Sequence, residues 1–269
     1  MDANLKPDQI LIHGARSASN SNYQQQLELF ERCSNSKDLC LERLRAVVDR
    51  LPRHESFLDI GAGNGILTLP LAKTFRRVVA VEPNPILAAN LKSRAPELHV
   101  LQDTWQNVDM GSALFDFILC SHVLYHLPEA EWMRQIDHMY EHLRPGGQMA
   151  LILQSPLGNK ASFFTAFSEP DINVLGLWKG ILHTYGEDAL DARYFTCDIH
   201  THTLDEMVAI ACLLLLHNSR WHDHPQAFRC YLDDHHRCDD GYHFQYDELI
   251  LLLSKKPRLE QRLTAEDGS

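Results

Sequence analysis

The sequence lacks an apolar stretch long enough to cross a bilayer, since its longest apolar run covers only Val208–Leu216. It opens with polar residues and without the apolar core of a secretory signal peptide. Its seven cysteines are an odd number and include no C-x-x-C pair. These absences predict a cytoplasmic protein with reduced thiols and no membrane partner.

Positive charge is also scarce. The chain has 25 Lys and Arg against 36 Asp and Glu, a formal net charge of -11 and a sequence pI near 5.8. Its longest basic cluster is the segment 255–258. Binding of nucleic acid requires a basic stripe or patch, so we do not expect DNA or RNA as a partner. The acidic balance is compatible with a small neutral or cationic substrate.

Sixteen histidines raise the question of a metal site. The segment 221–224 is rich in histidine, and two cysteines and two histidines follow in the segment 230–238. Zinc sites use spacings such as C-x₂-C with H-x₃₋₅-H, which neither segment has. We therefore predict a solvated polar loop here and no metal ion.

The segment Phe57–Gly65 is the most informative part of the chain. Apolar residues lead to Asp59, and glycines follow at positions 61, 63 and 65. The apolar residues 66–72 then predict a packed helix. The pattern indicates a strand, a tight glycine turn and a helix start, where glycine permits positive φ and lets a ligand approach the backbone.

The glycine spacing indicates which ligand this turn accommodates. A dinucleotide site has G-x-G-x-x-G, and the position of its last glycine is Ile66 here. A nicotinamide oxidoreductase is therefore disfavoured. D-x-G-x-G-x-G resembles the first motif of class I S-adenosylmethionine (SAM) methyltransferases. The resemblance implies SAM as cofactor, with Asp59, Gly61, Gly63 and Gly65 around its methionine part.

Acidic residues at the ends of two further predicted strands are compatible with a nucleoside ligand. The apolar segment 77–82 ends in Glu82, whose two carboxylate oxygens could accept both ribose hydroxyls. The next strand ends in Asp103, followed by Thr104 and Trp105. The resemblance implies that Asp103 accepts from the adenine amino group and that the next side chains cover the ring. A helix N-cap or loop acid is the alternative for Asp103.

The predicted elements alternate between strand and helix. Strands are expected at 56–60, 77–82, 98–103, 115–121 and 147–154, with helices at about 65–74, 85–94 and 128–143. Such alternation predicts a parallel sheet with helices on both faces. A sixth strand at 194–203, a helix at 204–218 and a last strand at 242–255 complete seven strands. The resemblance implies that the last strand is antiparallel and lies between the fifth and sixth.

Residues 1–50 are predicted to form an N-terminal helical lid, with helices near 22–33 and 36–50. Residues 51–269 would form the SAM-binding α/β domain, with helical insertions around 156–193 and 204–240. This layout is similar to that of histamine N-methyltransferase and its relatives. Tyr23 in the lid could reach the SAM carboxylate or the acceptor, or it could be a half-buried surface residue.

Ligands of open parallel sheets bind beyond the carboxyl ends of the strands. The fourth strand continues into Ser121, His122, Val123 and Leu124. Methyltransferases of nucleobase amino groups have Asn/Asp-Pro-Pro-Tyr/Phe there, so the chain instead resembles the small-molecule branch. By position, the resemblance assigns Ser121 to the cofactor.

The resemblance also implies an acceptor site, made by Tyr23, His122, Tyr125, Trp178 and Tyr246. His122 and Tyr125 are the catalytic candidates. His122 could accept a proton from an amine or hydroxyl. It could also only shape the pocket, and this interpretation is favoured because methyl transfer from SAM needs little beyond positioning.

The sequence thus favours a SAM-dependent methyltransferase that modifies a nitrogen or oxygen of a small molecule. An enzyme that displaces or cyclises the aminobutyryl chain of SAM and releases methylthioadenosine is the alternative. A non-enzymatic SAM-binding protein is a third alternative. Such a protein would be expected to have a damaged cofactor motif, and the motif here is intact. The sequence predicts neither the acceptor nor the oligomeric state.

Overall fold

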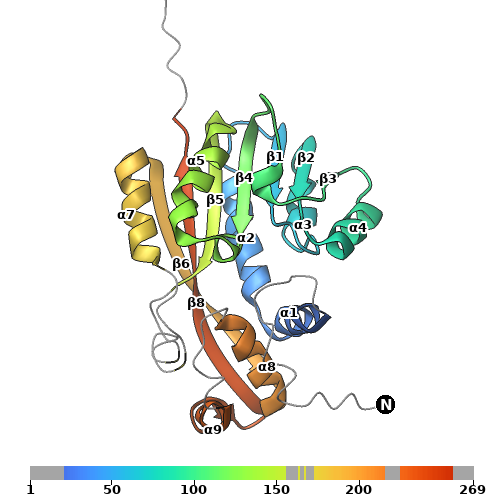
Figure 1. Ribbon diagram of the computed structural model, residues 1–269, viewed down its shortest axis with the longest axis vertical. Coiled ribbons are helices and arrows are strands. Elements are labelled where there is room, and N and C mark those ends of the chain that lie inside the picture. Colours follow the sequence, from blue (N-terminus) through green and yellow to red (C-terminus); the bar gives the residue numbers. More distant parts are fainter. Residues whose placement is uncertain (1–20, 156–162, 164–166, 168–172, 216–224, 257–269) are drawn as a thin grey trace, which may run out of the picture.

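A computed structural model describes residues 21–155, 163, 167, 173–215 and 225–256, with side chains from residue 25 onward (Figure 1). Its centre is one sheet with the strand order β3-β2-β1-β4-β5-β8-β6, in which β7 also pairs with β8. The strands are β1 (Ser56–Ile60), β2 (Arg77–Val81), β3 (His99–Leu101), β4 (Phe115–Ser121), β5 (Leu143–Gln154), β6 (Leu190–Thr201), β7 (Arg237–Cys238) and β8 (Gly241–Ser254).

Strands β1 to β5 are parallel to one another, and β8 runs antiparallel between β5 and β6. The predicted fold class and the predicted place of the last strand are therefore confirmed. The order reverses between β1 and β4, which are neighbours in the sheet although β2 and β3 separate them in the chain. Ligands of open sheets bind at such a reversal.

Helices precede the sheet and connect its strands. They are α1 (Ser21–Cys33), α2 (Ser36–Val48), α3 (Thr68–Ala72), α4 (Pro85–Arg94), α5 (Trp132–Glu141), α7 (Val174–Tyr185), α8 (Leu204–Leu214) and α9 (Pro225–His236), with short 3₁₀ turns η2 (Trp105–Asn107), η3 (Leu124–His126), η4 (Glu129–Glu131) and η5 (Glu187–Ala189). Capping residues in the sequence explain where some of these helices begin. The Asn84 side chain accepts from the N–H groups of Ile86 and Leu87, and Thr203 forms a capping box with Glu206.

Two apolar layers cover the two faces of the sheet. Successive strand residues point to opposite faces, so Phe57 belongs to one layer and Leu58 to the other. Buried side chains of α2, α3, α4, α8 and α9 build the first layer, and those of α5 and α7 build the second. Leu44 of α2 is completely buried in the first layer. Helix α2 is therefore part of the core.

Strand β8 is the longest of the described strands, and together with β6 it extends beyond the sheet toward α8 and α9 (Figure 1). Their pairing runs without interruption from Leu190 opposite Leu253 to Thr201 opposite Tyr242. The junction between α1 and α2 is tied to this ribbon, because the Asn35 backbone N–H donates to the Asp198 carbonyl. The ribbon thus extends past the edge of the sheet at which β1, β2 and β4 end, and its far end carries the β7–β8 turn.

Candidate functional site

A cavity of about 710 Å³ lies at the carboxyl ends of β1, β2 and β4, on the side where the strand order reverses. Its volume is in the range that suits a cofactor or a drug-sized ligand. Helix α1 contributes Leu27, Phe30 and Glu31 to its wall. Among the residues predicted for the site, the cavity brings together Asp59, Gly61, Gly63, Glu82, Thr104, Trp105, Ser121, His122 and Tyr125.

The glycine turn after β1 is fixed by hydrogen bonds to β2. The N–H groups of Gly61 and Ala62 donate to the Val81 carbonyl at 2.8 and 3.1 Å. Gly61 has a φ of 74°, and a Cβ there would lie 2.3 Å from Val123 Cγ2. Gly63 has a φ of 57°, and a Cβ there would meet no atom within 4 Å. Gly61 thus permits close packing, whereas open space lies beside Gly63.

Gly65 has a different environment from the other two glycines. Its φ is 81°, and an added Cβ would lie 2.6 Å from Leu91 Cδ1 and 3.1 Å from Leu69 Cγ. It is absent from the cavity lining. The geometry assigns Gly65 to the packing of the turn against α4 and α3, not to ligand contact.

Glu82 follows β2 and links the turn to the start of α4. One carboxylate oxygen accepts from the Gly63 N–H at 2.7 Å, and the other accepts from the Asn84 N–H at 2.8 Å. The side chain is 5% exposed, and burial raises the pKa of its carboxyl. A carboxylate oxygen can accept more than one hydrogen bond, so Glu82 can hold the turn and still accept from a ligand.

Asp59 is buried at the end of β1 and accepts from Thr68 Oγ1 at 2.5 Å. Burial raises the pKa of its carboxyl to about 7, although the Thr68 hydroxyl and nearby Lys37 oppose the shift. The buried group is therefore protonated over a pH range in which the unfolded chain carries a charge there.

This shift predicts how Asp59→Asn changes stability with pH. Because the folded-state pKa is raised, the stability from neutral Asp59 is present at the lowest pH and is lost as pH rises toward about 7. The neutral Asn side chain avoids this loss and can still accept from Thr68. Melting temperatures of the cofactor-free variant and wild type should diverge between about pH 4 and 7 in favour of the variant, and level off above. A difference that is independent of pH would contradict the assignment.

The loop that follows β3 lines the cavity, but its acidic residue, Asp103, does not. Thr104, Trp105 and Gln106 line the cavity. Asp103 is exposed and outside the lining, and its Oδ1 accepts from the Thr104 N–H at 2.7 Å and from Asn107 Nδ2 at 3.0 Å. The Asp103 carboxylate therefore has the contacts of a loop acid.

Strand β4 ends at Ser121, and the next residue, His122, has a strained backbone conformation. With a φ of 58°, His122 is the only non-glycine residue of positive φ among the described residues. Its N–H donates to the Ile152 carbonyl at 2.9 Å, which holds the peptide at the cavity. Its Nε2 lies 3.4 Å from Oε1 of Glu248, a carboxylate of β8 whose side chain is 2% exposed. The unusual backbone conformation aims the imidazole at this acid.

Tyr125 also lines the cavity, with its ring centroid 5.8 Å from that of His122. Its hydroxyl oxygen accepts from the backbone N–H of Gln154. Burial raises the pKa of the phenol well above its ordinary value, and the negative charge of Glu248 adds to this effect. Tyr125 is therefore a neutral phenol at physiological pH and cannot act as a phenolate base.

Two predicted acceptor residues, Tyr246 and Trp178, do not line the cavity. Tyr246 is completely buried beside Phe30, and its hydroxyl donates to Glu248 Oε1 at 3.2 Å, so it supports the cavity wall from behind. Trp178 lies on α7, which covers the sheet next to α5, and it is absent from the lining. Tyr23 lies in α1, but its side chain is outside the described part of the structure.

Several polar lining residues were not anticipated from the sequence, and four of them are Glu31, Lys37, Gln154 and Glu248. Glu31 accepts from Asn64 Nδ2 at 2.8 Å, which joins α1 to the glycine turn. A signal for Glu248 was present, because an acid stands next to an otherwise apolar strand, Leu249–Leu253. For the other three the sequence offers no comparable signal.

Residues 29–185 match the model of a protein family described as a methyltransferase domain. The match covers more than half of the 269 residues and includes the glycine turn, Glu82 and the end of β4. The chain belongs to this methyltransferase family. The matched domain is that of a SAM-dependent methyltransferase, whose cofactor is SAM.

Individual relatives agree with this assignment over shorter segments. An uncharacterized methyltransferase of Mycobacterium tuberculosis (strain ATCC 25618 / H37Rv) is 32% identical over 95 residues, 35% of this chain and 38% of that protein. The mitochondrial ubiquinone biosynthesis O-methyltransferase of Mus musculus is 32% identical over 100 residues, 34% of this chain and 26% of that protein. The chain thus matches well under half the length of each of these relatives.

Among solved structures, the fold is similar to that of the YcgJ protein from Bacillus subtilis. The TM-score is 0.55 at 13% sequence identity, with 82% of this chain and 98% of that chain covered. This likeness concerns the fold alone. Within the described ranges, none of the helices is sufficiently long and apolar to traverse a membrane.

Features of the cavity fit the methyltransferase cofactor. Two buried polar atoms of lining residues, Ser121 Oγ and Trp105 Nε1, have no hydrogen-bond partner among the described residues. Such atoms are costly to bury without a partner, which a polar ligand could supply. The open space beside Gly63 adds room at the glycine turn. Four carboxylic acids and one lysine line the cavity, a charge balance that suits a cationic sulfonium: Glu31, Asp59, Glu82, Glu248 and Lys37.

Proposed function

We propose that this methyltransferase moves the methyl group of SAM to a nitrogen or oxygen of a small molecule by in-line displacement. The observation that carries the proposal is that one cavity of about 710 Å³ is lined both by the glycine turn with Glu82 and by the pair of His122 and Glu248. Bound SAM supplies a methyl group that its sulfonium already makes electrophilic. The protein then has to align the acceptor, exclude water and take up a proton.

In the cofactor half, Glu82 is proposed to accept from the ribose hydroxyls. Asp59, Gly61 and Gly63 would surround the methionine part, and Thr104, Trp105 and Ser121 would contact the adenosine side. Lys37 is the only lysine or arginine among the described lining residues, so we assign it to the methionine carboxylate. Asp103 and Gly65 are left outside this set, because neither lines the cavity.

In the acceptor half, His122 is proposed to take the proton and Glu248 to stabilise the resulting imidazolium. Oε1 of Glu248 lies 3.4 Å from Nε2 and can accept a hydrogen bond from the ring. Tyr125, held by the Gln154 N–H, would position the acceptor as a neutral hydrogen-bonding group. Tyr246 would act through Glu248, and Trp178 is not included.

Helix α1 is proposed to act as the lid that closes this cavity, with Tyr23 facing the ligand. Its side chains Leu27 and Phe30 already form part of the wall, and Glu31 bonds to the glycine turn. A Tyr-bearing helix before the core is also part of the resemblance to histamine N-methyltransferase that the sequence suggests. Histamine itself is not carried over as the acceptor.

A small acceptor is supported by the acidic chain and by the size of the cavity. The mouse relative, by its name, is an O-methyltransferase of ubiquinone biosynthesis, which is also a small molecule. Displacement of the aminobutyryl chain is the second candidate. It uses the same pocket and the same electrophilic sulfonium, and it would need no acceptor site.

The products of SAM turnover distinguish the two reactions. We expect no reaction with SAM alone, and S-adenosylhomocysteine together with a methylated product when a panel of small amines and phenols is added, as measured by mass spectrometry. Methylthioadenosine formed from SAM alone would establish the second reaction instead. The Glu82→Ala variant is the control, because a product that it forms at the wild-type rate does not arise in this cavity.

A further inference from the structure

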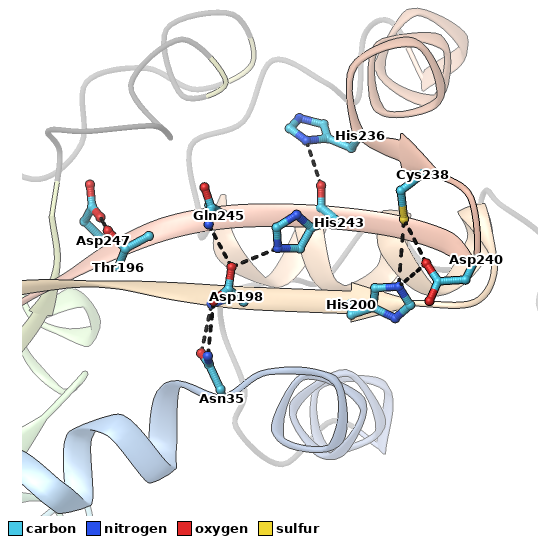
Figure 2. A network of polar contacts seen from close by, with 10 residues as sticks. All are labelled: Asn35, Thr196, Asp198, His200, His236, Cys238, Asp240, His243, Gln245 and Asp247. Atoms are coloured by element: carbon cyan, nitrogen blue, oxygen red, sulfur yellow. Dashed lines mark hydrogen bonds and ion pairs between the residues drawn. The ribbon is translucent and has the colours of Figure 1, made fainter.

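Outside the cavity, three residues that commonly bind metal ions meet at the distal end of the ribbon. His200 belongs to β6, Cys238 to β7, and Asp240 to the turn between β7 and β8 (Figure 2). His200 Nε2 lies 3.0 Å from Asp240 Oδ1 and 3.8 Å from Cys238 Sγ, and Sγ lies 3.4 Å from Oδ1. Their three donor atoms all lie within 4.8 Å of one another.

These distances match those between ligands of one tetrahedral zinc ion. Zinc bonds of about 2.0–2.3 Å to nitrogen, oxygen and sulfur place neighbouring tetrahedral ligands about 3.3–3.6 Å apart. Each of the three observed separations is close to this range. An ion at the centre of the triangle would need only small shifts of the side chains.

We propose that His200, Cys238 and Asp240 bind a zinc ion, with water in the fourth position. A thiolate together with an imidazole favours zinc and disfavours the hard cations Mg²⁺ and Ca²⁺, which prefer oxygen ligands alone. The Cys238 thiol gives its proton to solvent when the metal binds. The side chains of His200 and Asp240 are 39% and 79% exposed, so both a metal ion and its water can enter from solvent.

The backbone brings these residues together without help from a metal. Strand β8 pairs with β6 on one side and with β7 on the other, and Tyr242 is opposite both Thr201 and Arg237. Gly241 allows the hairpin to approach β6, because a Cβ there would lie 2.0 Å from the Thr201 carbonyl oxygen. Its φ of 143° is also one that side chains disfavour. The glycine thus positions Asp240 beside His200.

Surrounding contacts hold the histidine-bearing face of the ribbon in place. Asp198, two residues before His200, accepts from Gln245 Nε2 at 2.9 Å and lies 2.8 Å from His243 Nε2 (Figure 2). Asn35 donates to the same side chain at 3.3 Å. This polar network fixes the strand that carries His200, as supporting hydrogen bonds do around known metal ligands.

The proposed ion would be structural and not catalytic. Glu248 lies on β8 well beyond Asp240, and at about 3.3 Å per strand residue the two are separated by roughly 20 Å or more. A metal here would tie β6, β7 and β8 together at the end of the ribbon. Sequence spacing could not reveal it, because His200 lies 38 positions before Cys238.

Metal titration of the full chain tests the proposal. After treatment with a chelator, the protein should bind stoichiometric Zn²⁺ by calorimetry. Its Co²⁺ form should show the charge-transfer absorption of a thiolate ligand. His200→Gln, Cys238→Ser and Asp240→Asn should each weaken zinc binding at least about tenfold. Cys230→Ser is the matched control, because Cys230 is also an exposed cysteine and lies outside the cluster.

We also expect Zn²⁺ to raise the melting temperature of wild type and Cys230→Ser, but not of Cys238→Ser. A cobalt spectrum without thiolate absorption would overturn the proposal. Equal zinc affinity in Cys238→Ser and Cys230→Ser would overturn it as well. All ligand side chains are at the surface, so these substitutions should leave the fold intact.

Discussion

Glu82→Ala should lower the affinity for SAM at least about tenfold, as measured by calorimetry. The expected loss has two sources. The proposed bonds from both ribose hydroxyls disappear, each worth about 1.5–3 kcal/mol for a charged acceptor. In addition, the N–H groups of Gly63 and Asn84 lose the carboxylate that now fixes the glycine turn.

Comparing SAM with methylthioadenosine separates the loss of the ribose bonds from the effect on the glycine turn. A control variant separates both from a general loss of folding. Methylthioadenosine keeps the ribose but lacks the aminobutyryl chain, so the variant should lose similar affinity for it as for SAM. Glu97→Ala, at an exposed acid between α4 and β3, is the matched control and should bind SAM as wild type does. An unchanged SAM affinity in Glu82→Ala, or tight NAD binding by wild type, would contradict the proposed cofactor site.

Much of the fold could be predicted because its signals are local. Residues 57–60 and 77–81 are mostly apolar and are followed by a glycine turn and by an acid, and the structure has strands there. Helix α4 was expected at 85–94 and spans Pro85–Arg94, since Asn84 and Pro85 mark its start. The helix after the glycine turn is shorter than the expected 65–74, because regular α-helix begins only at Thr68.

The site was harder to predict, because its contacts join distant parts of the chain. Glu248 reaches His122 only because β8 inserts beside β5 and places residue 248 opposite Gln154. Trp178 and Tyr246 were assigned by position along the chain, whereas exposure depends on which face of the sheet each element covers. Asp103 shows the same limitation, since the loop after β3 places Thr104 and Trp105, not the acid, in the wall.

The conformation of His122 was likewise not visible in the sequence, yet it determines how its role can be tested. At a φ of 58°, alanine would be strained, whereas asparagine is among the residues that tolerate positive φ. Asparagine also keeps a polar side chain of similar reach. His122→Asn therefore removes the titrating ring with the smallest disturbance of the backbone.

If His122 takes the proton, His122→Asn should lower kcat by about 10²-fold or more and remove the acidic limb of the pH–rate profile. The Glu248 carboxylate 3.4 Å away leads us to expect this result over pocket shaping, which the sequence alone favoured. A residue that only shapes the pocket would change mainly KM and leave the profile intact. His126→Gln is the matched comparison, because His126 also lines the cavity but follows in η3, and it should keep the acidic limb. A raised KM with unchanged kcat and an intact acidic limb in His122→Asn would contradict this role. It would show that the proton goes to solvent and that His122 only shapes the cavity wall.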